Sequence, residues 1–317
     1  MSKPNQDNKT IRYSARGKLM ITGEYLALKG ARSLAWPTLS MHHLELTSLP
    51  GSEGNLIWNA LDMEGKPWFD ALFDTTNGID IINASDEKVA YNLTSILHAA
   101  ISLKGRNILQ SASFQIETSI EWPMQWGMGS SSSLLVNIAS WFQINPFELQ
   151  QKTIGGSGYD IACALSDQPI IFQKSDQLMA ARVHRPEILC EHGGLAYLGN
   201  KANTSDAIKN FEEKTKNIDL RTRIDLINRL TYHILDAKSV EHLIKAIEIH
   251  EETIGYLLDR DPIKKRQFQS FDGAVKSLGA WGGDFVLFVG KEKFEKFKLQ
   301  TEEQFGIKLY SIKDLLV

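Results

Sequence analysis

Cysteine is scarce in this chain, which has only Cys163 and Cys190 among its 317 residues. Two thiols cannot form the disulfide framework on which small secreted domains rely, so the composition favours a reducing compartment. Long apolar runs are also missing. The first residues are polar, unlike a signal peptide, and no segment has the roughly eighteen uninterrupted apolar residues of a membrane span. We therefore expect a cytoplasmic protein without a membrane partner.

An excess of charge of either sign is missing as well. The chain carries 35 basic and 38 acidic residues, which gives a formal net charge of -3. A nucleic-acid partner would require a broad basic face, so we expect no nucleic-acid binding. With 43% hydrophobic and 23% charged residues, the composition is that of an ordinary globular protein with enough chain for two domains.

What the chain does contain is a mixture of helical and strand-like periodicity, without internal repeats or low-complexity tracts. In the first half, residues 19–22 and 114–117 resemble strands, and residues 87–100 and 130–142 have the apolar spacing of helices. In the second half, the spacing predicts two long helices, over 227–234 and 240–254, followed by a glycine-rich turn and a strand over 285–289. The pattern predicts an α+β protein.

The segment Trp122–Ser133 (WPMQWGMGSSSS) is the strongest local signal of chemistry. Its glycines permit a tight turn, and the helix that follows offers unpaired N–H groups to an anion. Serine hydroxyls at this point also suit a magnesium ion, which prefers oxygen ligands. A plain helix N-cap explains the same residues. The segment lacks the lysine and the spacing of GxxxxGK[ST], so an ordinary P-loop is excluded.

This segment resembles the second motif of the GHMP kinases, PxxxGLGSSA, with Ser132 in place of the usual alanine. Three further segments resemble motifs of the same superfamily in the same order. Ser14–Tyr25 resembles APGKxxLxGEY with Arg16 in place of proline, Gly156–Asp160 resembles the segment that presents the catalytic aspartate, and Lys276–Asp284 resembles KxSGAGGGD with Trp281 in place of glycine. The chain is most similar to the phosphomevalonate kinase and mevalonate kinase branch.

The resemblance implies a role for each matched residue. Asp160 would be the catalytic base, and Lys18 would support it by keeping the carboxylate ionised. The ATP phosphates would bind at Gly127, Met128, Gly129, Ser130, Ser131 and Ser132, and the hydroxyl of Ser131 or Ser130 would contact Mg²⁺. The resemblance places Glu24, Ser157, Thr204, Gly282 and Gly283 at the substrate.

Several of these residues have a purely structural alternative. Asp160 is also suited to cap the helix that follows it, and Thr204 or Asn203 is suited to cap a helix beginning near Asp206. Glu148 lies near the place of a magnesium-binding glutamate, but Asn145, Pro146 and Glu148 are explained by helix capping. His250 and Glu251 begin like the zinc motif HExxH, but Ile254 stands where the second histidine would be, which excludes that site.

The resemblance further implies a two-domain GHMP kinase fold. An N-terminal ATP-binding domain over 1–172 would contain a left-handed βαβ crossover, and a C-terminal domain over 173–317 would be ferredoxin-like, with the boundary near residues 168–174. The implied activity is transfer of the γ-phosphoryl group of ATP, with Mg²⁺, to mevalonate or 5-phosphomevalonate. Homoserine, a sugar, or a nucleotide-binding regulator without activity are the alternatives. The protein is expected to be a monomer or a homodimer.

Overall fold

The computed structural model describes residues 10–49, 54–110, 112–174, 178–199, 204–281 and 284–317. The chain divides into two compact units, and it passes between them more than once. Among the described residues, unit 1 takes the segment up to Gly17 together with Ser40–Met124 and Gly129–Leu165, whereas unit 2 takes Lys18–Leu39, Gln125–Met128 and Ser166–Val317. The domain boundary expected near residues 168–174 stays a prediction, because these units are defined by packing and take two early segments into unit 2.

Unit 1 is a twisted sheet with helices packed on it. Its strand order is β5-β4-β3-β6-β2, with β1 also paired to β2, and β3 runs parallel to β6 while the other pairs from β5 to β2 are antiparallel. The first strands, β1 and β2, continue into unit 2. The elements are β1 (Thr10–Met20), β2 (Ser33–Leu49), β3 (Asn55–Leu61), β4 (Pro67–Asp74), β5 (Asp80–Ala84), α1 (Glu87–Lys104), β6 (Ser113–Ile120), η2 (Met124–Trp126), α2 (Ser130–Phe142), α3 (Pro146–Lys152) and α4 (Tyr159–Ala164).

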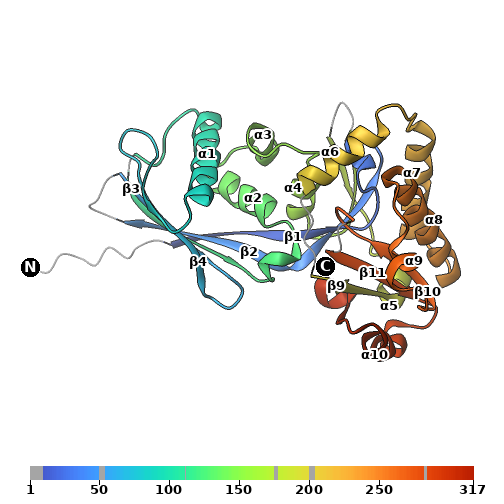
Figure 1. Cartoon of the computed structure of the whole chain (residues 1–317). Helices are drawn as coiled ribbons and strands as arrows, with labels where there is room; N and C mark the ends of the chain where they lie inside the picture. The colour runs from blue at the N-terminus through green and yellow to red at the C-terminus, as the bar shows by residue number, and fades with distance from the viewer. Residues whose placement is uncertain (1–9, 50–53, 111, 175–177, 200–203, 282–283) are drawn as a thin grey trace, which may run out of the picture. The chain divides into compact units, whose positions relative to one another are not determined.

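Local sequence explains why the helices of unit 1 form where they do. The side chain of Asp86 caps α1 by accepting from the N–H of Val89, and Gly105 ends the helix with φ 74°. Ala90, Leu93, Leu97 and Ala100 form its buried stripe. Figure 1 shows α1, α2 and α3 together on one face of the strands, and their apolar side chains join those of β2, β3, β4 and β6 in one core.

Unit 2 contains a small antiparallel sheet with the strand order β10-β11-β9-β12. In chain order this is the 4-1-3-2 arrangement of a ferredoxin-like fold, as the resemblance predicted. A second ladder pairs the start of β2 with β7, and β7 with β8. The elements are η1 (Leu26–Lys29), β7 (Ile170–Lys174), β8 (Leu178–Arg182), α5 (Glu187–His192), β9 (Gly193–Tyr197), α6 (Thr204–Thr215), α7 (Arg221–Leu235), α8 (Val240–Leu258), α9 (Ile263–Gln267), β10 (Gly273–Ser277), β11 (Phe285–Gly290), α10 (Phe294–Phe305), β12 (Leu309–Ser311) and α11 (Ile312–Leu315).

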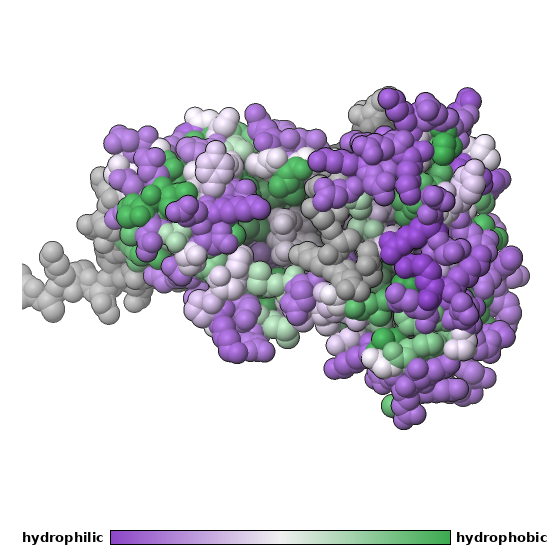
Figure 2. All heavy atoms as spheres, viewed as in Figure 1, coloured by the Kyte–Doolittle hydropathy of each residue, from purple (hydrophilic) through white to green (hydrophobic). Residues whose placement is uncertain are grey.

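The two long helices predicted in the second half are present as α7 and α8, which pack side by side and are drawn in brown tones in Figure 1. The α8 helix also packs against β10, while Phe268, Phe271, Phe288 and Phe297 build an aromatic core on the small sheet. Figure 2 shows mostly hydrophilic residues on the visible surface, with separate apolar patches. Within the described part of the chain, no helix combines the length and apolar character needed to cross a membrane.

Candidate active site

The glycine-serine segment forms a sharp turn that leads directly into α2, which begins at Ser130 as predicted. Gly127 has φ 65° and Gly129 has φ 89°, conformations that glycine adopts at low cost and other residues rarely adopt. Gly129 occupies the N-cap position, so no side chain caps α2. The first N–H groups of this 13-residue helix are therefore left for an anion.

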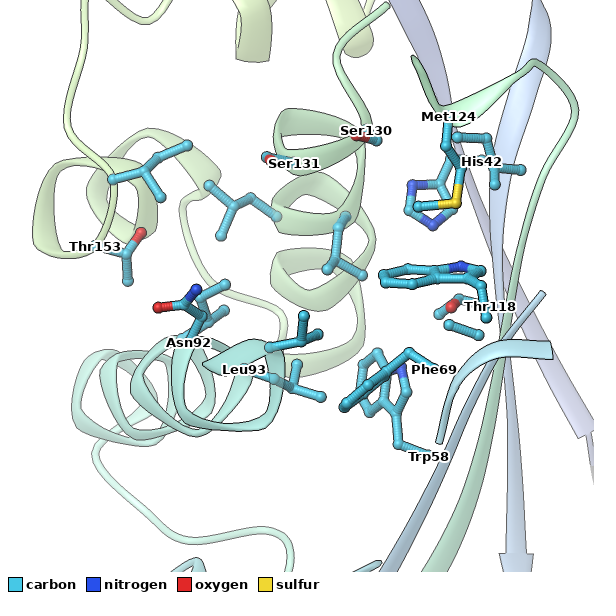
Figure 3. A pocket seen from close by; sticks show the side chains of 18 of the residues that line it. His42, Trp58, Phe69, Asn92, Leu93, Thr118, Met124, Ser130, Ser131 and Thr153 are labelled. Carbon is cyan, nitrogen blue, oxygen red and sulfur yellow. The ribbon is translucent and has the colours of Figure 1, made fainter. Parts of the chain in front are cut away.

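A cavity of about 390 Å³ opens beside this helix start, and all of its lining residues belong to unit 1. Its walls are mainly apolar and come from β3, β4, α1 and α2. Figure 3 shows Trp58 and Phe69 on one side, Leu93 on another, and Ser130 and Ser131 at the start of α2. Ligand pockets for small molecules fall in a range of roughly 300–1,000 Å³, so the cavity is large enough for a nucleotide base.

Few polar groups line this cavity. They include Ser130 and Ser131 from α2, Asn92 from α1, and His42 from β2. Burial lowers the pKa of His42 to about 4, so its ring is neutral at physiological pH. Its Nδ1 atom lies 2.9 Å from the hydroxyl of Ser133, and its carbonyl accepts a hydrogen bond from the side chain of Asn137. His42 thus fixes the first turns of α2 against β2.

The sequence interpretation missed the cavity walls, although the signal was present. Every second residue of β3 is buried, so Leu56, Trp58 and Ala60 share one face. That alternation identifies an inward face, but it does not show that α1 and α2 stop short of filling it. Nothing in the local sequence of His42 distinguishes it from an ordinary core or surface histidine.

Asp160, the predicted base, is the second residue of α4, and α4 packs against α2. Its Oδ1 atom accepts a hydrogen bond of 2.9 Å from the side chain of the buried Gln150. The N-cap of α4 is Gly158, so the alternative that Asp160 caps this helix is wrong. The carboxylate is half-buried and is oriented by a neutral amide, and its role as a base stays a prediction.

Ser157 and Ser132 have structural partners in unit 1. The hydroxyl of Ser157 is buried and accepts the N–H of Tyr159 at 3.5 Å, beside the start of α4. The hydroxyl of Ser132 donates to the carbonyl of Gly129 at 2.9 Å. Ser132 therefore stabilises the turn through its side chain, and its contact with phosphate stays a prediction. The predicted cap of α3 is confirmed, since Asn145 accepts from the N–H of Phe147 and Pro146 is the first helical residue.

In unit 2, the first and second motifs meet at the backbone. The N–H of Lys18 donates to the carbonyl of Met128 at 2.8 Å, and the side chain of Met128 is buried. This bond fixes the position of the glycine-serine turn relative to the Lys18 segment of β1. The predicted roles of Lys18 and Met128 in catalysis and nucleotide binding stay predictions.

Glu24 lies in the interior of unit 2, where its side chain is 1% exposed. Its Oε1 atom accepts a hydrogen bond from the ammonium of Lys276, and its Oε2 atom lies 3.5 Å from Nε2 of His250. Burial raises the pKa of Glu24, while Lys276 acts in the opposite direction. Its predicted contact with substrate would have to compete with this ion pair.

The glycine-rich turn is held through the carbonyl groups of its residues. The hydroxyl of Tyr25 donates to the carbonyl of Ala280 at 2.7 Å, and the guanidinium of Arg260 donates to that of Trp281. Trp281 has φ 58° and is 1% exposed, so its indole is buried inside unit 2, next to Gly255. Gly282 and Gly283 lie outside the described residues, as does the side chain of Thr204.

Asp284 is a polar residue to which the sequence interpretation gave no role. A Cβ atom on Gly127 would lie 3.6 Å from its Oδ2 atom, and a Cβ on Gly279 would lie 3.9 Å from the same oxygen. The carboxylate therefore lies between the glycine of the second motif and that of the third. It also helps to raise the pKa of Tyr25 to about 12, chiefly a result of burial.

The described residues contain no group of three His, Cys, Asp or Glu side chains placed to hold a metal ion. Magnesium in nucleotide sites usually keeps several waters and shares phosphate oxygens, so it needs few protein ligands. Hydroxyls at the cavity mouth, from Ser130 and Ser131, are oxygen donors of the right kind. The residues present therefore fit a magnesium ion that arrives with a nucleotide.

Comparison with known proteins gives agreement in structure only: no family model matches the chain, and no curated protein matches its sequence. Mevalonate kinase of Methanococcus jannaschii is 15% identical, with a TM-score of 0.68 and coverage of 97% of this chain and 98% of that chain. Phosphomevalonate kinase of Streptococcus pneumoniae, in complex with phosphomevalonate and AMPPNP, is 16% identical, with a TM-score of 0.68 and coverage of 94% and 98%.

Galactokinase of Lactococcus lactis, complexed with galactose, is 12% identical, with a TM-score of 0.67 and coverage of 95% of this chain and 92% of that chain. The matches span nearly the whole of each chain although the sequences have diverged widely. The predicted fold class is confirmed: the chain has the fold of the GHMP kinases.

Proposed function

We propose that the chain is an ATP-dependent kinase that transfers the γ-phosphoryl group to the small molecule mevalonate or 5-phosphomevalonate. The observation that carries this proposal is the cavity of unit 1 at the uncapped start of α2. A largely apolar cavity suits a purine base, and a free helix N-terminus suits phosphates. The cavity and the start of α2 lie side by side, as the base and the phosphates of one nucleotide would require.

The residues of the chain have distinct tasks in this reaction. The backbone N–H groups of Ser130, Ser131 and Ser132 bind phosphate oxygens, and the hydroxyls of Ser130 and Ser131 would hold the magnesium ion. That ion neutralises charge on the phosphates when it is bound. Asp160, oriented by Gln150, accepts or orients the proton of the acceptor hydroxyl, and Lys18 stabilises the transferring group.

The acceptor is inferred from the motifs and the fold. The Gly-Gly-Asp ending at Asp284 favours phosphomevalonate kinase, and so does Gly199–Ser205, which resembles the TGxxAST segment of those kinases. Mevalonate kinase shares the other motifs. Solved structures with this fold include kinases of both kinds and one that binds galactose. A sugar or homoserine is therefore the alternative acceptor. A cytoplasmic location and a monomeric or homodimeric state remain predictions from the sequence.

A second candidate is a nucleotide-binding regulator that does not catalyse. Trp281 favours it, because this residue adopts φ 58° where the family motif has glycine. Arg16, which stands in place of the usual proline, is the other departure. Fold alone does not separate an enzyme from an inactive relative.

The test is ADP release from Mg-ATP by the purified chain, with mevalonate, 5-phosphomevalonate, homoserine and galactose offered at equal concentration. Acceptor-dependent release with one of the first two supports the proposal. ADP release only with homoserine or galactose would mean that this compound, and not mevalonate or 5-phosphomevalonate, is the acceptor. Nucleotide binding without release for any of the four would favour the regulator.

A further inference from the structure

Four ionisable side chains lie together in the interior of unit 2, and the proposed reaction uses only one of them. Glu24, His250, Glu251 and Lys276 are each at most 1% exposed. They come from the segment after β1, from α8 and from β10. Burying charged groups is costly unless each is paired, so the arrangement of this cluster needs an explanation.

Lys276 carries the positive charge of the cluster. Its ammonium donates to Oε1 of Glu24 and to the carbonyl of Ser277, the latter at 2.9 Å. His250 is neutral, because burial and Lys276 lower its pKa well below the ordinary value. Its Nε2 atom accepts the N–H of Gly23 at 3.1 Å, so its proton is on Nδ1. His250 therefore adds no charge to balance a second carboxylate.

Glu251 is the second carboxylate, and it binds the end of β10. Its oxygens accept the N–H of Ser277 at 3.1 Å and the hydroxyl of Ser277 at 2.9 Å, together with the N–H of Ile263 at 3.3 Å. Burial raises the pKa of Glu251 to about 7, Lys276 lowers it, and Glu24 raises it. Arg266, from α9, is a further charged group that interacts electrostatically with Glu251.

Ser277 is the last residue before the glycine-rich turn, so its position determines where the turn begins. Leu278, the next residue, donates its N–H to the carbonyl of Phe285 at 3.0 Å. The turn then packs against α8, the helix that carries Glu251, because the indole of Trp281 lies next to Gly255. Residues 278–281 are thus held to α8 at both ends, through Glu251 at the start and through Gly255 at Trp281.

We propose that Glu251 is a positioning residue, which sets through Ser277 and Lys276 where residues 278–281, the described start of the glycine-rich turn, lie and thereby makes the kinase respond to pH. The proposal rests on the proposed function, because the turn's contact with substrate or phosphate is inferred from the family motif. With Glu251 protonated, Lys276 and Glu24 form a neutral pair. With Glu251 ionised, two carboxylates draw on one ammonium, and the contacts of Lys276 and Ser277 change.

The first test compares the KM for the acceptor in the wild type, in Glu251→Gln and in Glu252→Gln, from pH 6 to pH 8.5. Glu252 is the next residue on α8 and is exposed, so it is the matched control. With a pKa of about 7, Glu251 changes from about 90% to about 10% protonated between pH 6 and pH 8. We expect the KM of the wild type and of Glu252→Gln to rise by up to about tenfold above pH 7.

The side chain at position 251 is neutral at every pH in Glu251→Gln, so the KM of this variant for the acceptor should stay within about twofold of the low-pH wild-type value. In the wild type, kcat should change less with pH than KM does. A wild-type pH profile that Glu251→Gln reproduces would overturn the proposal. A residue that only stabilises the fold would not remove a pH dependence selectively. If Glu251→Gln fails to fold, Ser277→Ala removes one donor to the carboxylate and should shift the midpoint of the profile.

A second measurement does not depend on catalysis. Tryptophan fluorescence of the wild type should change with a midpoint near pH 7, Trp281→Phe should lack this change, and Glu251→Gln should lack it too. This result would stand even if no acceptor were phosphorylated, so failure of the proposed function and failure of this inference are distinguishable. A fluorescence change that persists in Glu251→Gln would contradict the coupling.

Discussion

The two units bury polar groups in opposite ways. Unit 1 surrounds its cavity with apolar walls and holds the buried, neutral His42 beside the start of α2. Unit 2 buries the ionisable side chains of Glu24, Glu251 and Lys276 together. An apolar space can accept a ligand, whereas a paired ionic cluster fixes the backbone around it. The first arrangement suits binding and the second suits positioning.

The comparison also gives the two units opposite responses to pH. His42 has a lowered pKa in the folded chain, so its contribution to stability is present above the unfolded value of 6.5 and is lost as the pH falls towards 4. Glu251 has a raised pKa, so its contribution is present at low pH and is lost as the pH rises through about 7. A fall in pH from 6.5 towards 4 should weaken unit 1 through His42, and a rise in pH from 4.5 through about 7 should weaken unit 2 through Glu251.

The largest effect on stability is expected from Lys276→Met. The substitution leaves Glu24 and Glu251 buried without a cation between them, and breaking a buried pair costs about 3–5 kcal/mol. Urea unfolding should show this loss, whereas Lys245→Met, at an exposed position of α8, should change stability by less than about 0.5 kcal/mol. A loss below about 1 kcal/mol for Lys276→Met would mean that the cluster is weakly coupled to the fold.

Removing the titrating ring of unit 1 is expected to have the next largest effect. Between pH 7 and pH 4 the wild type should lose roughly 3 kcal/mol more than His42→Gln, because the unfolded chain protonates this histidine first. Thermal unfolding followed across this range measures the difference. His233→Gln changes an exposed histidine and should follow the wild type. If the stability of all three proteins fell equally between pH 7 and pH 4, His42 would not have a lowered pKa in the folded chain.

Sequence predicted the parts of this architecture that local pattern determines. The helix over 130–142 was predicted with the bounds that α2 has, because a glycine-serine turn and a regular apolar stripe mark both of its ends. The helix expected over 87–100 continues to Lys104, where Gly105 ends it. Of the strand expected at 19–22, only residues 19 and 20 are strand, and they end the longer β1 (Thr10–Met20), whose earlier polar residues pair with β2.

The candidate site could be predicted only as far as its motifs. Glu24 and Lys276 are 252 residues apart in sequence, so no local pattern indicates that they form an ion pair. The cavity arises because α1 and α2 leave space above β3 and β4, which is a property of packing. Trp281 stands in place of a motif glycine, and its indole is buried beside α8. Its left-handed backbone conformation gave no signal in the sequence.

A smaller effect should follow from trimming the cavity wall. Trp68 lines the cavity and is 43% exposed, so Trp68→Ala removes ligand contact while costing little core packing. We expect about tenfold weaker ATP binding, equivalent to about 1.4 kcal/mol, by isothermal titration calorimetry. Tyr91→Ala, which removes an aromatic side chain that is 69% exposed and away from this cavity, is the control. Equal affinity of both variants for ATP would mean that the adenine base does not bind in this cavity.

The smallest effect on nucleotide binding is expected from a substitution in the glycine-serine turn. Gly127→Ala and Gly65→Ala each force alanine into a left-handed conformation, with φ 65° and φ 75°, and should each cost about 1–2 kcal/mol of stability. A Cβ at Gly65 meets nothing within 4 Å, whereas one at Gly127 lies 3.6 Å from Asp284. Only Gly127→Ala should raise the KM for ATP, by a few-fold. An equal KM in both variants would separate this turn from the nucleotide.

The most direct test of the whole account compares acceptor-dependent ADP release by the wild type and by Asp160→Asn. Gln150 can still hydrogen-bond the side-chain oxygen of the asparagine, so the fold and the affinity for Mg-ATP should be kept. Loss of the base should lower kcat by about 10²–10⁴-fold. Lower kcat with unchanged nucleotide affinity is the predicted result. Equal turnover in the two proteins would remove Asp160 from the mechanism and contradict the proposed active site.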